Sequence, residues 1–182
     1  MSLSTEIHNE DHYGKITAPR TLVMQRYLPG PIERVWEYLT KSDLRRQWLA
    51  SGEMEMKVDS PVELVWHHVQ TTTPPGKRPE GVNEESHLPS RVTVCEPPHK
   101  LGFMFWSDSE VLFELQKSGN RVLLTLTHSK LPSRGMMVGV SSGWHAHLDV
   151  LEARLANTKA ENFWDHHTAY KAQYEQRIPQ DA

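Results

Sequence analysis

Residues 135–157 read GMMVGVSSGWHAHLDVLEARLAN, and this stretch decides the fold. Trp144, Leu148, Leu151 and Leu155 recur within it at helical spacing, which predicts a long helix with one apolar stripe. An apolar stripe has to be covered by another element. Because the segments before it have strand character, we expect this helix to lie across a sheet.

Seven segments precede the long helix with the pattern of short strands. Residues 53–58 alternate between apolar and charged side chains, and a turn at 59–61 leads into the next segment, so these two are expected to form a hairpin. The last four candidates are linked by short turns, which favours an antiparallel meander. The expected strands are residues 20–27, 53–58, 62–69, 91–95, 101–106, 111–117 and 121–128.

Helical spacing appears in three further places. After the first strand, Pro31 precedes apolar residues at helical intervals, and a second short helix should follow from Ser42 or Asp43. Residues 159–177 predict an additional C-terminal helix.

Residues 70–89 have no periodicity and are rich in Thr, Pro and charge, which indicates a long mobile loop.

Together these elements predict an α+β fold with two layers. A twisted antiparallel sheet curls, so a helix on its concave face can leave a cavity between the layers. We divide the chain into an N-terminal extension at 1–19, one domain at 20–157, and an additional helix and tail at 158–182.

Composition excludes several classes of protein. The chain has 182 residues, a formal net charge of -3, and 37% hydrophobic residues, which is typical of a single globular domain and unlike a nucleic-acid-binding protein. No apolar run approaches the ~20 residues needed to span a bilayer, and the polar N-terminus is unlike a signal peptide. We therefore expect a cytoplasmic location, with the lone Cys95 as a structural thiol.

Four sequence words accompany this order of elements. They are LPGPIERVW at 28–36, RQWLA at 46–50, EPPHKLGF at 96–103 and SGWHAHLD at 142–149. The chain resembles the START-like (SRPBCC) superfamily and, through these words, the activator of heat-shock protein 90 ATPase homologue family, over residues 20–157. The resemblance implies a helix-grip fold, in which a curved antiparallel sheet wraps around a long C-terminal helix and two short helices follow the first strand.

The resemblance implies fold more strongly than activity. The eukaryotic activators carry an extra N-terminal domain that docks on the chaperone, and the first 19 residues here could not supply one. A stress-related co-chaperone role, acting on a heat-shock protein, is thus the third hypothesis for function. Some START-like proteins are aromatases, cyclases or hydrolases, so the resemblance also leaves a cofactor-free enzyme open.

The 11 histidines do not have the spacing of a metal site. His145 and His147 lie about 200° apart around a helix, and His67 and His68 would point to opposite faces of a strand. No HExxH or CxxC motif is present. We expect no metal and no cofactor.

Acid or base catalysis would need a polar group facing the cavity. His68, His128 and His145 are the candidates, although a histidine satisfied within the core is the commoner arrangement. No set of nucleophile, base and orienting residue is visible in the sequence. An enzyme is therefore the second hypothesis.

Binding of a small apolar ligand is the first hypothesis. Large rings fall on the apolar faces of the expected strands and long helix, where they could fill a solid core or line a pocket. Ser141, Ser142 and His145 beside Trp144 could serve as polar anchors. The expected ligand-binding residues are Trp66, His68, Phe103, Phe105, Phe113, Trp144, His145 and Leu148. A homodimer through the sheet edge or the C-terminal helix is a further expectation.

Overall fold

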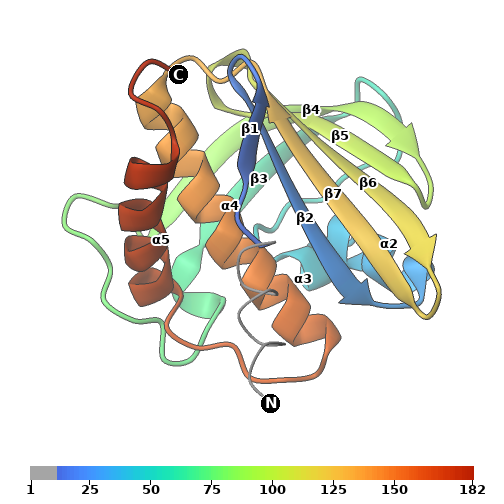
Figure 1. Ribbon diagram of the computed structural model, residues 1–182. Helices are drawn as coiled ribbons and strands as arrows, with labels where there is room; N and C mark the ends of the chain where they lie inside the picture. The colour runs from blue at the N-terminus through green and yellow to red at the C-terminus, as the bar shows by residue number, and fades with distance from the viewer. Residues whose placement is uncertain (1–11) are drawn as a thin grey trace.

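The computed structural model describes residues 12–182, and its centre is a single curved sheet (Figure 1). Neighbouring strands are antiparallel, in the order β1-β2-β7-β6-β5-β4-β3. The strands are β1 (Lys15–Ala18), β2 (Thr21–Pro29), β3 (Pro61–His67), β4 (Glu85–Glu96), β5 (Lys100–Met104), β6 (Glu110–Ser118) and β7 (Arg121–Ser129).

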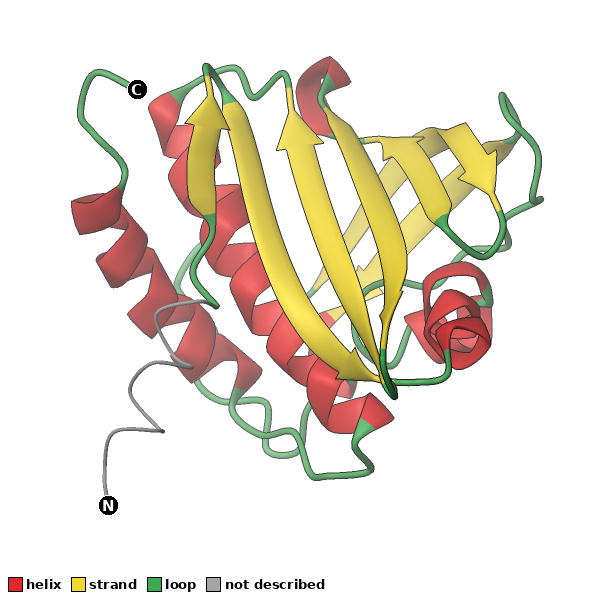
Figure 2. Ribbon diagram, turned by 45° about the vertical axis from the view of Figure 1, so that its right-hand side comes forward, coloured by secondary structure: helices red, strands yellow, loops and turns green. Residues whose placement is uncertain are grey.

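The long helix α4 (Arg134–Leu155) packs against this sheet. Figure 2 shows α4 lying across one face of the sheet, with α5 beside it and farther from the strands. The short helices α2 and α3 lie near the end of β2, from which the chain continues into them. The elements are α2 (Ile32–Thr40), α3 (Ser42–Arg45), α4 (Arg134–Leu155), α5 (Phe163–Arg177) and the 3-10 turns η1 (His68–Gln70) and η2 (Trp106–Asp108). The predicted α+β helix-grip fold is confirmed.

Alternation along β2 and β7 explains why one face of the sheet is the core. Met24 on β2 pairs with Leu126 on β7, and both are buried. Leu126 in turn pairs with Phe113 on β6, which is also buried. Side chains two residues apart point to the same face, so the three strands present a continuous apolar surface to α4.

The long helix begins where the sequence predicts. Ser133 caps it by accepting a hydrogen bond from the backbone N–H of Met136 (3.2 Å). The expected stripe of Trp144, Leu148, Leu151 and Leu155 is buried, which confirms the predicted packing. Other sides of α4 are buried as well, because α5 covers the part of the helix that the sheet leaves free.

Residues 53–58 do not form the predicted strand, and the predicted hairpin with 62–69 is wrong. Met56 and Val58 remain 36% and 47% exposed. β3 pairs with β4, and on its other side it makes one isolated bridge, from Val65 to Ser51. The alternating pattern was present, but the segment turns away at Asp59, whose backbone is left-handed (φ 68°).

The predicted loop at 70–89 is shorter than expected. Residues 85–89 belong to β4, where Leu88 pairs with Leu64 on β3 and is buried. The remaining loop is tied to the start of α5, since Asn162 and Trp164 donate backbone hydrogen bonds to the carbonyls of Pro74 and Pro75 (2.7 and 2.9 Å).

The sequence also did not predict β1, which extends the sheet beyond β2 within the region we assigned to an N-terminal extension. Residues 1–11 of that extension lie outside the described residues. Within residues 12–182, no helix is both long and apolar enough to cross a membrane.

A buried arginine shapes the segment between α3 and β3. Arg45 is 1% exposed and donates to the backbone carbonyls of Leu39, Thr40, Ala50 and Gly52. Its fork of N–H groups suits several acceptors at once. The segment is thereby held in a compact loop, which places Leu49 inside the molecule.

Candidate functional site

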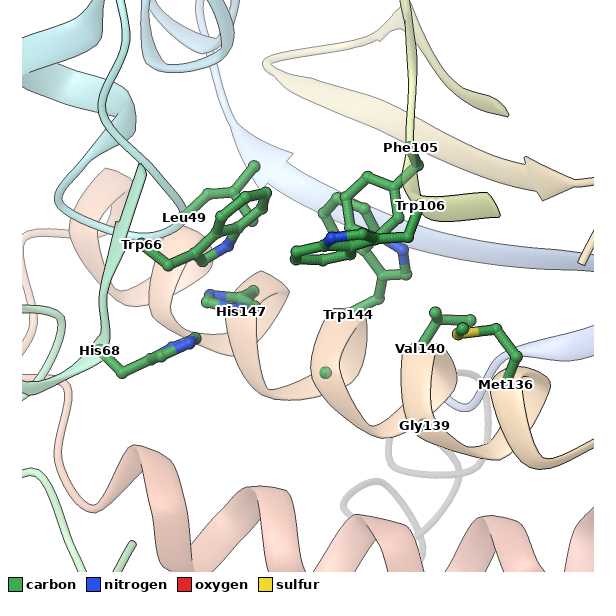
Figure 3. A pocket seen from close by; sticks show the side chains of 11 residues that line it. Leu49, Trp66, His68, Phe105, Trp106, Met136, Gly139, Val140, Trp144 and His147 are labelled. Carbon is green, nitrogen blue, oxygen red and sulfur yellow. The ribbon is translucent and has the colours of Figure 1, made fainter. Parts of the chain in front are cut away.

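A pocket of about 230 Å³ lies between α4 and the sheet. Figure 3 shows that its lining side chains come from α4 on one side and from the sheet and its connections on the other. The pocket runs from His68 at one end to Met136 and Val140 at the other. The lining residues are Leu49, Trp66, His68, Phe105, Trp106, Met136, Gly139, Val140, Gly143, Trp144 and His147.

Two glycines form much of the helical wall. Gly139 and Gly143 are four residues apart and so lie on the same face of α4. A Cβ atom added at either position would meet no atom within 4 Å. Glycine inside a helix costs about 1 kcal/mol relative to alanine. The helix therefore carries two unfavourable residues at the place where their missing side chains leave open space.

Aromatic rings form the opposite wall. Trp66 and Trp106 lie with ring centroids 5.1 Å apart and planes tilted by 30°, and Phe105 meets both rings edge-on. Trp66 is buried, whereas Trp106 is 38% exposed. Since Gly139 across from it is also exposed, the pocket reaches the surface between η2 and the first half of α4.

A series of hydrogen bonds links the indole of Trp144 to the backbone of Trp106 through His128 and Ser109. The indole N–H of Trp144 donates to Nδ1 of His128 (3.0 Å), and Nε2 of His128 lies 2.8 Å from Oγ of Ser109. The Ser109 hydroxyl donates to the carbonyl of Trp106 (2.7 Å). Because Nδ1 accepts, the proton of the neutral His128 ring must be on Nε2. Each polar group in this series of hydrogen bonds therefore has a partner.

His128 is therefore a positioning residue for the Trp144 indole. It is buried, and burial lowers its pKa to about 4, so the ring is neutral at pH 7. Both of its nitrogens are occupied within the protein. The sequence suggests His128 as an acid or base facing the cavity, but in the structure it is hydrogen-bonded to the indole of Trp144 and is not part of the lining.

His147 lies at the polar end of the pocket. Its Nδ1 is 2.6 Å from the carbonyl of Trp48, and a carbonyl can only accept, so Nδ1 carries the proton. The side chain is 6% exposed, and burial lowers its pKa to about 3. The proximity of His68 is the second cause of this lowered pKa. His147 is thus a neutral imidazole with Nε2 unprotonated.

His68 faces His147 at the same end, with ring centroids 5.7 Å apart (Figure 3). Its ring stacks on Phe163 at 5.4 Å and contacts Trp164 at 4.7 Å, both from the start of α5. Burial lowers the pKa of His68 to about 4, with smaller effects from His167 and His67. Nδ1 is buried without a hydrogen-bond partner among the described residues.

Four of the eight expected ligand-binding residues line the pocket: Trp66, His68, Phe105 and Trp144. Phe103, Phe113 and Leu148 lie in the solid core, each no more than 1% exposed. Phe113 packs between Trp48 and Trp144, at centroid distances of 6.2 and 5.7 Å. These three residues support the lining from behind.

His145 lies on the other side of α4, away from the pocket. It stacks on Tyr170 of α5 with centroids 3.7 Å apart, and its Nδ1 lies 3.0 Å from the hydroxyl of Tyr174. Burial, followed by the charge of Arg26, lowers its pKa to about 2. His145 and His147 therefore face different neighbours, in keeping with their spacing along the helix. The proposed anchors Ser141 and Ser142 are also buried outside the lining.

Sequence reasoning missed seven lining residues, and most of them had a signal that could have revealed them. Five of them each lie three or four residues from another of the five along α4, which defines one helical face beside Trp144: Met136, Gly139, Val140, Gly143 and His147. The exceptions are Leu49 and Trp106, whose positions depend on the loop held by Arg45 and on the turn η2. The missed residues are Leu49, Trp106, Met136, Gly139, Val140, Gly143 and His147.

The site contains few groups that could hold a metal ion. Across the described part of the chain, no group of three or more His, Cys, Asp or Glu residues has the arrangement of a metal site. Cys95 lies outside the pocket, and burial raises the pKa of its thiol.

Comparison with known proteins identifies the family. The family described as "Activator of Hsp90 ATPase homolog 1-like protein" matches residues 29–156. A protein from Bordetella parapertussis, encoded by gene BPP1335 and solved by NMR in solution, shares 36% identity over 93% of this chain and 91% of its own, with a TM-score of 0.79. No curated protein matches the chain.

More distant structures share the fold alone. CalU16 from Micromonospora echinospora has 19% identity over 90% of this chain and 93% of its own, with a TM-score of 0.63. A protein from Rhodobacter sphaeroides has 20% identity over 79% of this chain and 97% of its own, with a TM-score of 0.61. The matched region holds the short helices, the strands from β3 to β7 and all of α4, and so every lining residue of the pocket. The chain belongs to the family of activator of Hsp90 ATPase homolog 1-like proteins.

Proposed function

We propose that this protein binds a small, largely apolar molecule in the pocket between α4 and the sheet. The observation that carries the proposal is the pair Gly139 and Gly143, whose missing side chains leave space beside aromatic walls. A helix that only had to complete a core would be more stable with alanine or a larger residue at both positions.

The volume limits the size of the ligand. The pocket, at about 230 Å³, is roughly one and a half times as large as the ~150 Å³ engineered cavity that accommodates benzene. Sites for drug-sized molecules start at about 300 Å³. A molecule with one or two rings, stacked against Trp66 and Trp106, is the size that fits.

The chemistry of the lining favours binding over catalysis. Among the eleven lining residues, His68 and His147 have the ionisable side chains, and there is no carboxylate, hydroxyl, thiol or amine. Both imidazoles are neutral at pH 7, because burial lowers their pKa values to about 4 and about 3. A cofactor-free enzyme is the second candidate, since an unprotonated imidazole could take a proton from a bound molecule.

Calorimetric titration with naphthalene tests the proposal. We expect one site per chain in the native protein and no measurable binding to Gly143→Leu, whose side chain would occupy the pocket. Gly135→Leu is the matched control, because Gly135 is an exposed residue of the same helix outside the pocket. Equal affinities of the native protein and Gly143→Leu would refute the proposal. Incubation with a bound ring compound, followed by mass spectrometry, separates a carrier from an enzyme, since a carrier returns the compound unchanged.

A further inference from the structure

The polar end of the pocket has a defined hydrogen-bonding character. His147 donates from Nδ1 to the Trp48 carbonyl, and this bond fixes both the ring orientation and the tautomer. Nε2 is left with a free lone pair, and the ring that carries this nitrogen lines the pocket. The site therefore presents an acceptor and cannot present a donor from this ring unless the bond to Trp48 is broken.

The surroundings make this acceptor selective. Leu49, Trp66 and Trp144, the lining residues that Figure 3 shows around His147, are each no more than 3% exposed. In such an apolar setting, a polar group left unpaired by the wrong ligand costs more than a correct hydrogen bond gains. A site built around a buried polar group therefore discriminates against analogues that lack the matching group.

His68 adds the complementary donor. A neutral imidazole always has one N–H. Its Nδ1 is buried without a hydrogen-bond partner among residues 12–182, and an unpaired buried N–H is less tolerable than an unpaired lone pair. The proton therefore belongs on Nε2 of His68. A single oxygen between the two rings could then accept from His68 and donate to His147, because the ring centroids are 5.7 Å apart.

Other oxygen-containing groups fit this end of the pocket less well than a hydroxyl does. Neither imidazole is protonated at pH 7, and no Lys or Arg lines the pocket. A carboxylate or phosphate would be brought into an apolar site without a counter-charge, which is strongly unfavourable. A ketone or ether oxygen could accept from His68 but would leave Nε2 of His147 unpaired.

We propose that the ligand of this pocket carries a neutral hydroxyl group on a skeleton of one or two rings, and that Nε2 of His147 accepts the hydrogen bond from this hydroxyl. The inference rests on the proposed binding function and adds the chemical class of the ligand. The ring system occupies the space beside Gly143 and Trp66, and the hydroxyl lies between His68 and His147.

The test compares 2-naphthol, naphthalene and 2-methoxynaphthalene by calorimetry at pH 7. We expect the native protein to bind 2-naphthol roughly three- to tenfold more tightly than naphthalene, which is the usual effect of one net hydrogen bond. 2-Methoxynaphthalene, which has the oxygen without the proton, should bind no more tightly than naphthalene. These three measurements need no variant.

Two substitutions of His147 then assign the preference to one atom. His147→Asn retains an amide N–H near the position of Nδ1 and removes the acceptor at Nε2, so it should bind 2-naphthol and naphthalene equally. His147→Gln places an amide oxygen near the position of Nε2 and should keep the preference. Circular dichroism checks that both variants are folded.

The outcomes separate the two proposals. Equal binding of 2-naphthol and naphthalene to the native protein, or an unchanged preference in folded His147→Asn, would overturn the hydroxyl inference and leave the binding function intact. If none of the three probes binds the native protein, the binding function fails and the inference fails with it.

Discussion

Replacing the glycines of the helical wall with alanine should raise stability and weaken binding at the same time. Gly139→Ala and Gly143→Ala each remove a residue that costs about 0.8–1.0 kcal/mol inside a helix. The new methyl groups should meet no steric resistance, because a Cβ atom at either position has no neighbour within 4 Å. The double variant should therefore gain about 2 kcal/mol if the two effects add.

Thermal unfolding followed by circular dichroism measures the gain. For a chain of this size, 1 kcal/mol shifts the Tm by about 2–4 °C, so the double variant should melt roughly 4–8 °C higher than the native protein. Naphthalene titration of the same samples should show weaker binding, since both methyl groups project into the pocket. Gly135→Ala provides the control, because it lies in the first turn of α4 outside the pocket and should leave naphthalene affinity unchanged.

Two results would refute this reasoning. A lower Tm in Gly143→Ala would mean that a neighbouring side chain already occupies the space beside the glycine. A higher Tm with unchanged naphthalene affinity would mean that the probe binds elsewhere and that the glycines have another role.

Three further predictions concern stability. Acid should destabilise the protein, because an unfolded histidine, with a pKa near 6.5, takes up a proton before a buried one does. Stability should be full above pH ~6.5 and decline towards pH ~4, by up to about 1.4 kcal/mol per pH unit for each buried histidine; urea midpoints that do not change across this range would contradict it. The residues responsible are His68, His128, His145 and His147, whose pKa values are lowered to about 4, 4, 2 and 3. His128→Phe should cost about 1–3 kcal/mol in urea denaturation, because the indole N–H of Trp144 loses its acceptor, and an unchanged midpoint would show that this bond contributes nothing. Arg45→Met should cost at least ~3 kcal/mol, because four backbone carbonyls lose their donor, whereas a loss no greater than that of an exposed Arg121→Met control would contradict the role assigned to Arg45.

Most of the fold could be predicted because burial and periodicity coincide in it. The stripe from Trp144 to Leu155 is buried as its spacing predicts, and β6 and β7 alternate as expected. The alternation at 53–58 was misleading, because it shows which side chains could be buried together and not whether a neighbouring strand is available. Conversely, Leu88 lies beside Pro89 and among polar residues typical of a loop, yet its pairing with Leu64 makes that segment a strand.

The site was harder to predict than the fold. Trp66 and Trp144 were recognised because they are large and lie on apolar faces. Phe113 has the same pattern, but it packs against Trp48 and Trp144 and so belongs to the core. Periodicity in the sequence does not encode such packing. Gly143 could not be found by looking for apolar side chains, since its contribution is the space left by the side chain that it lacks.

The helix α5 has a consequence for how the polar end of the pocket could change in evolution. It lies beyond residues 29–156, yet Phe163 and Trp164 at its start form the backing of His68, and Phe163 also contacts His147 at 4.7 Å. The polar end of the pocket is thus backed by a segment outside the residues 29–156 that match the family. For the proposed binding function, substitutions confined to α5 are predicted to shift these two imidazoles and alter ligand preference, while the sheet, α4 and the glycine wall remain unchanged.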